Sequence, residues 1–191
     1  MKLAILAGGK GTRLGFRDIP KPLVSVAGKP ILEHQILLAR KFDIKEIFIL
    51  SGYMADKIKE YFGDGSSFGL RIKHIVENKP LGTAGAVKLL EGEVDERFMI
   101  FYGDVIMDFN VDSFIAFDRK NNSIASILIH PNDHPYDSDL VEVDRNNRVI
   151  AFHSKPHKEG VYYSNLVNAA VYILSPQIFN FIRTNEFSDF G

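Results

Sequence analysis

The chain lacks cysteine altogether, and its opposite charges nearly cancel. Without cysteine there is no disulfide and no thiolate metal site, and this composition fits a reducing cytosol, so we expect a cytoplasmic protein. The formal net charge of −1 over 191 residues gives no electrostatic reason to expect nucleic acid or a membrane surface as a partner.

Long hydrophobic runs are also missing. The apolar start from Leu3 to Ala7 is too short for the core of a signal peptide, and no run approaches the ~20 apolar residues of a membrane span. What remains is a chain of 191 residues with 46% hydrophobic content, which suits a single globular domain.

Short apolar runs alternate with helical patterns through the first half of the chain. We expect strands at residues 2–6, 46–50, 70–76 and 98–102, and helices at 30–42, 54–62 and 82–90. Strands separated by helices indicate βαβ units. The predicted fold class is therefore α/β, with a Rossmann-like, mostly parallel (mixed) sheet and helices on both faces.

The second half is less regular. We expect a helix at 111–120, strands at 124–129 and 166–174, and a short helix from Pro176 to residue 182. The Asn146-Asn147 dipeptide favours a turn, so residues 140–143 and 149–153 are predicted to pair as a hairpin. We interpret 1–110 and 111–191 as two parts of one domain.

A glycine-rich stretch follows directly on the first predicted strand. It reads Leu6-Ala7-Gly8-Gly9-Lys10-Gly11-Thr12-Arg13. Glycine permits positive φ and close backbone approach, so such a loop can aim several N–H groups at one phosphate. A surface turn would also use glycine, but it would not explain Lys10 and the forked cation of Arg13 inside the turn. The stretch predicts a polyphosphate loop, although its spacing fits neither the dinucleotide fingerprint nor a Walker A loop.

Three polar or glycine positions fall just past the ends of predicted parallel strands. They are Gly8, Glu77 and Asp104. Ligands of open α/β sheets bind outside the carboxyl ends of the strands, so we expect one shared site there. A carboxylate at the end of an apolar strand is costly if unpaired, and Mg²⁺ favours one or two carboxylates plus substrate oxygens. Asp104 is therefore the candidate metal ligand, with a turn or capping aspartate as the alternative.

The motif Pro20-Lys21-Pro22 follows the glycine loop. Together they resemble the signature of the sugar-1-phosphate nucleotidyltransferases, with matches at Gly9, Gly11, Thr12, Arg13, Pro20, Lys21 and Pro22. The resemblance implies an Mg²⁺-dependent enzyme that makes a nucleotide sugar and pyrophosphate from a nucleoside triphosphate and a sugar 1-phosphate. It is strongest toward the branch whose substrates are heptose or mannose 1-phosphate and GTP.

The resemblance also implies roles for individual residues. Arg13 would hold the departing pyrophosphate, and Lys21 would contact the α-phosphate or the sugar phosphate. The nucleotide would lie on the loop residues Leu6 to Gly9, Gly11 and Thr12 and on Leu81-Gly82-Thr83, whose N–H groups would read the base. Lys155 and Asn168 would bind the sugar phosphate, although Ser154 replaces the family's glutamate beside Lys155. These roles make 1–110 the nucleotide-binding part and 111–191 the sugar-binding part.

Two residues carry finer expectations. Glu77 accepts hydrogen bonds only, which suits the N1–H and 2-amino edge of guanine better than uracil. Asp189, in the stretch Asp189-Phe190-Gly191, is a second candidate metal ligand. In relatives this stretch continues into more chain, so we expect a piece of a longer protein.

Several alternatives stay open from the sequence. Uridylyl or thymidylyl transfer would use the same motifs. The sequence Asp137-Ser138-Asp139 imitates the Asp-x-Asp of some glycosyltransferases that use nucleotide sugars, although a solvated loop explains it better. A non-catalytic nucleotide-sensing module is a third class, and Arg13, Lys21 and Asp104 argue against it. The base, the sugar and whether the chain forms a homo-oligomer are not determined.

Overall fold

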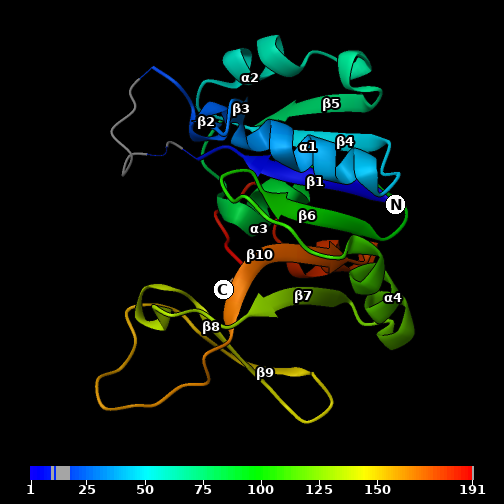
Figure 1. Cartoon of the computed structure of the whole chain (residues 1–191). Coiled ribbons are helices and arrows are strands. Elements are labelled where there is room, and N and C mark those ends of the chain that lie inside the picture. Colours follow the sequence, from blue (N-terminus) through cyan, green and yellow to red (C-terminus); the bar gives the residue numbers. More distant parts are fainter. Residues whose placement is uncertain (10, 12–17, 191) are drawn as a thin grey trace.

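A computed structural model describes residues 1–9, 11 and 18–190 (Figure 1). Its centre is an eight-stranded sheet in the order β5-β4-β1-β6-β10-β8-β9, with β7 also paired to β10. The first four of these strands are parallel, as the βαβ pattern predicts. Their bounds are β1 (Lys2–Ala7), β4 (Glu46–Ser51), β5 (Arg71–Val76) and β6 (Phe98–Tyr102).

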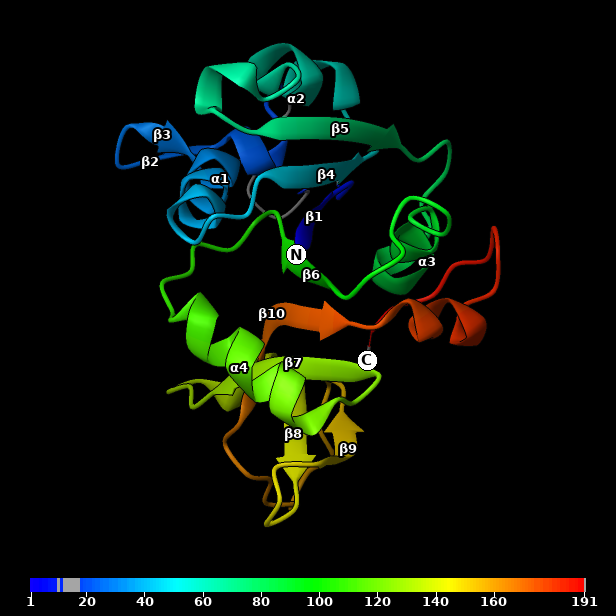
Figure 2. The ribbon, with the colours of Figure 1, turned by 90° about the vertical axis from the view of Figure 1, so that its right-hand side faces the viewer.

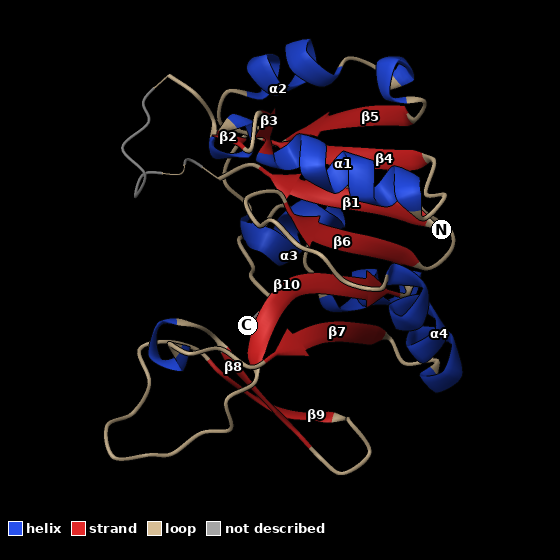
Figure 3. Cartoon of the chain, viewed as in Figure 1, coloured by secondary structure: helices blue, strands red, loops and turns tan. Residues whose placement is uncertain are grey.

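The other half of the sheet is antiparallel, so the sheet is mixed. Strand β10 (Val167–Leu174) lies between β6 and β7 (Ala125–His130) and runs opposite to both. The predicted hairpin of β8 (Leu140–Val143) and β9 (Val149–His153) is confirmed and extends beyond β7 (Figure 3). Asp144 closes its turn by accepting hydrogen bonds from the N–H groups of Asn146 and Arg148.

Helices cover both faces of the sheet (Figure 2). Helices α1 (Ile31–Lys41), α2 (Ala55–Phe62) and α4 (Val111–Asn121) pack on one face, and α3 (Gly82–Lys88) and the 3₁₀ helix η5 (Pro176–Phe181) on the other. Alternation along β1 explains the two layers, because Leu3 and Ile5 face the first core and Ala4 faces the second. In the part of the chain that the structure describes, no helix could cross a membrane.

The structure corrects the prediction around Pro30. We expected Pro30 inside the first helix, but it ends the short strand β3 (Lys29–Pro30), and α1 begins at Ile31. Strand β3 pairs with β2 (Ser25–Val26), and a tight turn with positive φ at Ala27 and Gly28 joins them. Strands this short carry no readable alternation, so periodicity alone could not reveal the hairpin. Three further 3₁₀ turns are η2 (Lys21–Leu23), η3 (Ser66–Phe68) and η4 (Pro135–Asp137).

Candidate functional site

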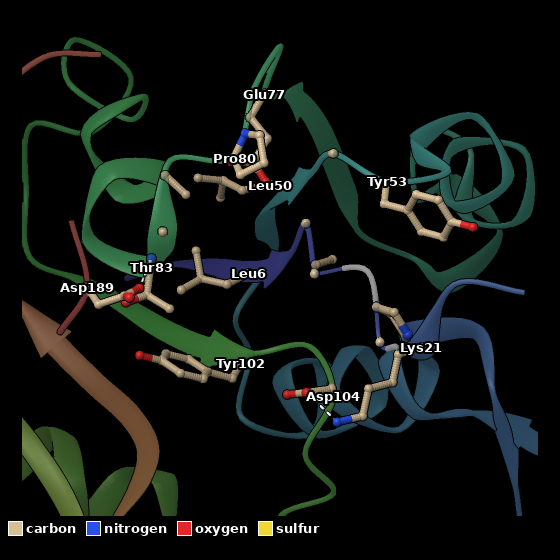
Figure 4. Close-up of a pocket in the computed structure, with 18 of the residues that line it drawn as sticks. Leu6, Lys21, Leu50, Tyr53, Glu77, Pro80, Thr83, Tyr102, Asp104 and Asp189 are labelled. Atoms are coloured by element: carbon tan, nitrogen blue, oxygen red, sulfur yellow. Dashed lines mark hydrogen bonds and ion pairs between the residues drawn. The ribbon is translucent and has the colours of Figure 1, made fainter. Parts of the chain in front are cut away.

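A cleft of about 870 Å³ opens at the carboxyl ends of the parallel strands (Figure 4). Most of the predicted site residues that the structure describes line it: Leu6, Ala7, Gly8, Gly9, Gly11, Lys21, Glu77, Gly82, Thr83, Asp104 and Asp189. Lining residues that the sequence analysis did not single out include Leu50, Gly52, Tyr53, Ala86, Tyr102 and Phe187. The expectation that Gly8, Glu77 and Asp104 meet at the strand ends is confirmed, while the roles of the lining residues stay predictions.

Lys10, Thr12 and Arg13 lie outside the described residues. Their roles in holding phosphate stay predictions. Gly11 is described, has φ of +59°, and lies so close to Lys21 that a Cβ on Gly11 would be 2.9 Å from the Lys21 Cβ. Gly11 of the glycine stretch and Lys21 of the Pro20-Lys21-Pro22 motif therefore meet in space.

The ammonium of Lys21 and the carboxylate of Asp104 form an ion pair. Lys21 Nζ lies 2.6 Å from Asp104 Oδ2, and the two side chains are 31% and 39% exposed. Lys21 is the first residue of η2, and Asp104 follows the end of β6. In the structure the carboxylate is therefore paired with a lysine. A metal would have to displace the lysine or share the carboxylate with it, and a phosphate would have to displace the carboxylate or share the lysine with it.

Glu77 lies across the backbone of two glycines. A Cβ on Gly8 would be 1.9 Å from Glu77 Oε1, and a Cβ on Gly52 would be 2.8 Å from the same atom. The other oxygen accepts a hydrogen bond from Leu81 N at 3.2 Å. Burial raises the pKa of the Glu77 carboxyl above its ordinary value of 4.5, and the Leu81 hydrogen bond opposes this rise. The side chain is thus fixed against the cleft wall.

The N-terminus of α3 is occupied by residues far along the chain. Asp189 Oδ1 accepts hydrogen bonds from Thr83 N at 2.8 Å and Thr83 Oγ1 at 3.1 Å. The carbonyl of Ser188 accepts from Ala84 N and Gly85 N. The expectation that the Thr83 N–H is free to read a base is therefore wrong in this structure. Gly82 has room only for hydrogen, because a Cβ there would lie 2.5 Å from Ser188 O.

Two tyrosines form a polar connection behind the cleft. Tyr102 lines the cleft, and its ring lies 6.0 Å from that of Tyr172. Burial raises the pKa of both phenols, so both stay neutral at ordinary pH. The predicted sugar residue Asn168 donates through Nδ2 to the Tyr172 hydroxyl at 2.5 Å. The side chain of Tyr172 therefore separates Asn168 from Tyr102, which lines the cleft.

Lys155 lies in a different contact. Its Nζ donates to the Asp137 carbonyl at 2.6 Å, and its backbone N–H donates to Asp139 Oδ1 at 3.3 Å. Lys155 is exposed and is not among the described residues that line the cleft. Its role, like that of Asn168, stays a prediction.

Two carboxylates of the cleft, those of Asp104 and Asp189, are the candidate metal ligands. Asp104 and Asp189 lie on either side of Tyr102 (Figure 4). Among the described residues no group of three or more His, Cys, Asp or Glu side chains is arranged to hold a metal, and this includes Asp137 and Asp139. Mg²⁺ needs only one or two protein carboxylates, because water and substrate oxygens complete its shell.

Comparison with known proteins gives consistent matches. A family model described as nucleotidyl transferase matches residues 2–190. The D-glycero-alpha-D-manno-heptose 1-phosphate guanylyltransferase of Campylobacter jejuni is 35% identical over 97% of this chain and 81% of its own length. The UTP–glucose-1-phosphate uridylyltransferase of Synechocystis is 30% identical over 100% of this chain and 53% of its own.

A solved structure supports the same relationship. HddC from Yersinia pseudotuberculosis, complexed with GMP-PN, superposes with a TM-score of 0.79 and 26% identity, covering 98% of this chain and 82% of that one. The chain spans about half the length of most of the curated relatives it matches.

Proposed function

The chain belongs to the nucleotidyl transferase family, and from this premise we propose that it joins a nucleoside triphosphate to a sugar 1-phosphate, releasing pyrophosphate. GTP is the favoured triphosphate, and a heptose or mannose 1-phosphate is the favoured acceptor. The observation that carries the proposal is the meeting of Gly11, Lys21 and Asp104 in one cleft at the strand ends.

The reaction asks the protein for position and charge rather than for a nucleophile of its own. An oxygen of the sugar phosphate attacks the α-phosphorus, and pyrophosphate leaves in line. Lys21 supplies the ammonium for the α-phosphate or the sugar phosphate, and its two flanking prolines restrict its backbone. Arg13 supplies the second cation, for the departing pyrophosphate.

Asp104 and Asp189 are the residues that would hold Mg²⁺. When bound, the ion supplies positive charge to the phosphate oxygens. Thr83 fixes Asp189 through Oδ1 alone, which leaves Oδ2 as the oxygen that could face a ligand. Because one oxygen contacts Thr83 and the other could contact a metal, the geometry supports Asp189 as the second metal ligand.

Glu77 supports guanine as the base. A carboxylate accepts hydrogen bonds, and the guanine edge offers an N1–H and a 2-amino group as donors. Glu77 lines the cleft, with Oε2 held by Leu81 N and Oε1 against Gly8 and Gly52, so the carboxylate is fixed at the wall that a base would approach. The heptose guanylyltransferase and the GMP-PN complex among the relatives agree with this choice. The uridylyltransferase relative keeps uridylyl or thymidylyl transfer as the second candidate.

The test is a screen for pyrophosphate release. Four nucleoside triphosphates are combined with a panel of hexose and heptose 1-phosphates in the presence of Mg²⁺. Release with GTP and a manno-configured sugar phosphate supports the proposal, and preference for UTP or dTTP replaces the base assignment. Glycosyl transfer from a nucleotide sugar, without pyrophosphate, would identify a glycosyltransferase. Nucleotide binding without any turnover would identify a sensing module.

A further inference from the structure

The turn that carries Asp104 has little backbone support of its own. It runs from Tyr102, the last residue of β6, to Val105. Gly103 N donates to Leu6 O at 2.8 Å, which ties the turn to β1, while Val105 N reaches Tyr102 O only at 3.3 Å. No backbone hydrogen bond of Asp104 itself is among those of the described residues. Apart from the ion pair with Lys21, a group from another element that holds this turn would also fix the position of the aspartate.

Gln35 on α1 provides that group. Its side-chain nitrogen lies 2.7 Å from Tyr102 O and 2.6 Å from Val105 O. A primary amide has two N–H donors, and here both meet carbonyls that bracket Gly103-Asp104. The acceptors also fix which end of the amide faces the turn, because its oxygen would repel both carbonyls.

Packing alone does not explain a glutamine at this position. Gln35 is 1% exposed, and its Oε1 atom is buried without a hydrogen-bond partner in the described part of the chain. A buried acceptor without a partner costs free energy, whereas an apolar side chain of similar length would fill the space without that cost. The two donated hydrogen bonds are what the glutamine provides.

The same helix also supports the segment that carries Lys21. Ile31 N, at the start of α1, donates to Val24 O at 3.0 Å, just beyond η2. His34 Nε2 lies 2.8 Å from Val26 O in the following strand. Helix α1 therefore contacts the elements on both sides of the Lys21–Asp104 pair.

We propose that Gln35 is a positioning residue. By holding the turn, it fixes the Asp104 carboxylate relative to Lys21 and to the phosphates and metal of the proposed reaction. The inference rests on the proposed function for its catalytic consequence. It acts at a distance: Gln35 contacts backbone carbonyls and not the ligand. Misplacement of a reacting or ligating group by about 1 Å can cost up to about 10²-fold in rate, so the loss of both donors should be visible in turnover.

The test compares Gln35→Met with a matched control. Methionine keeps the length of the side chain and removes both donors. The control is Ser126→Ala, which removes a buried hydroxyl that donates to Asp118 at 2.7 Å, and neither of these residues lines the cleft. We expect Gln35→Met to lower kcat by about 10- to 100-fold and to raise the Mg²⁺ concentration for half-maximal rate. We expect Ser126→Ala to lower the melting temperature and to leave both kcat and the Mg²⁺ concentration for half-maximal rate unchanged.

Two measurements do not depend on turnover. Amide exchange of the peptide containing 102–105 should be faster in Gln35→Met and unchanged in Ser126→Ala. Binding of Mn²⁺–GTP without sugar phosphate, followed by the Mn²⁺ electron paramagnetic resonance signal, should be weaker in Gln35→Met. If the methionine variant does not fold, Gln35→Asn keeps the amide but is too short to reach both carbonyls, and the same results are expected.

A double mutant with Asp104→Asn distinguishes a positioning role of Gln35 from a general loss of structure in the variant. In an Asp104→Asn background, Gln35→Met should cost little more, because the group that it positions is already lost. Equal losses in both backgrounds, or unchanged amide exchange at 102–105, would overturn the role of Gln35. If the wild type releases no pyrophosphate with any substrate pair, the proposed function fails, while amide exchange still tests whether Gln35 holds the turn.

Discussion

The substitution Asp104→Asn tests whether the Asp104 carboxylate serves catalysis or only stabilises the fold, because the two roles predict different effects on turnover and on melting temperature. The substitution keeps size and removes the charge that faces Lys21 Nζ at 2.6 Å. Because both side chains are about a third exposed, water screens the pair, and an exposed ion pair contributes about 0.2–1 kcal/mol. For a domain of this size 1 kcal/mol corresponds to roughly 2–4 °C, so the melting temperature should fall by no more than about 4 °C.

The expected effect on catalysis is larger. Loss of one preorganised electrostatic group in a transition state costs about 10²- to 10³-fold in kcat, or about 2.7–4 kcal/mol. In Asp104→Asn the activation free energy should therefore rise by several times more than the free energy of unfolding falls. Raising Mg²⁺ should recover part of the rate, because the metal keeps its phosphate ligands when it loses one carboxylate.

The assay pairs melting curves without metal or nucleotide with pyrophosphate release across a Mg²⁺ titration. Glu93→Gln is the matched control, because Glu93 pairs with Lys73 at the same 2.6 Å, is 36% exposed and does not line the cleft. Both variants should lose similar stability, and only Asp104→Asn should lose turnover. An Asp104→Asn enzyme that melts early but works normally would refute the assignment.

Three further predictions concern the walls of the cleft. Since burial raises the pKa of Glu77, the stability that this carboxyl contributes should be lost as pH rises from about 4.5 through that raised pKa. Relative to the wild type, Glu77→Gln should therefore be equally stable in urea unfolding near pH 4 and more stable at pH 8. Gly8→Ala places a Cβ 1.9 Å from Glu77 Oε1, so GTP affinity should drop in equilibrium dialysis, and adding Glu77→Ala should relieve the clash but not restore the base preference. Asp189→Ala removes the acceptor for Thr83 N and should cost about 0.5–2 kcal/mol in denaturant unfolding, the scale of a lost helix cap, whereas an unchanged midpoint would show that the contact is dispensable.

Much of the architecture could be predicted because it repeats along the sequence. The apolar runs that became β1, β4, β5 and β6 are separated by helical patterns, and that order alone indicates parallel pairing. Parallel strands bring their carboxyl ends to one edge, so Gly8, Glu77 and Asp104 could be placed together before any coordinates were known.

What could not be predicted depends on contacts between distant residues. In the sequence Gln35 is an ordinary polar residue of a helix. Only the structure shows that its amide donates to the carbonyls on both sides of Asp104. The Lys21–Asp104 pair joins residues 83 positions apart, and neither position carries a local signal for the other. The family resemblance and the helix start both point to Thr83 N–H as a base contact, and neither reveals its acceptor Asp189, which lies 106 positions away.

That long separation has a consequence for how the cleft comes into being. The parallel strands can pair as soon as Tyr102 has left the ribosome, because β1, β4, β5 and β6 are by then all present. The first turn of α3 must wait much longer, since the acceptors for its N–H groups are Ser188 and Asp189. Contacts of such long range form late and slow the folding of a domain. A growing chain would therefore have the parallel half of its sheet before the wall of the cleft at α3 is complete.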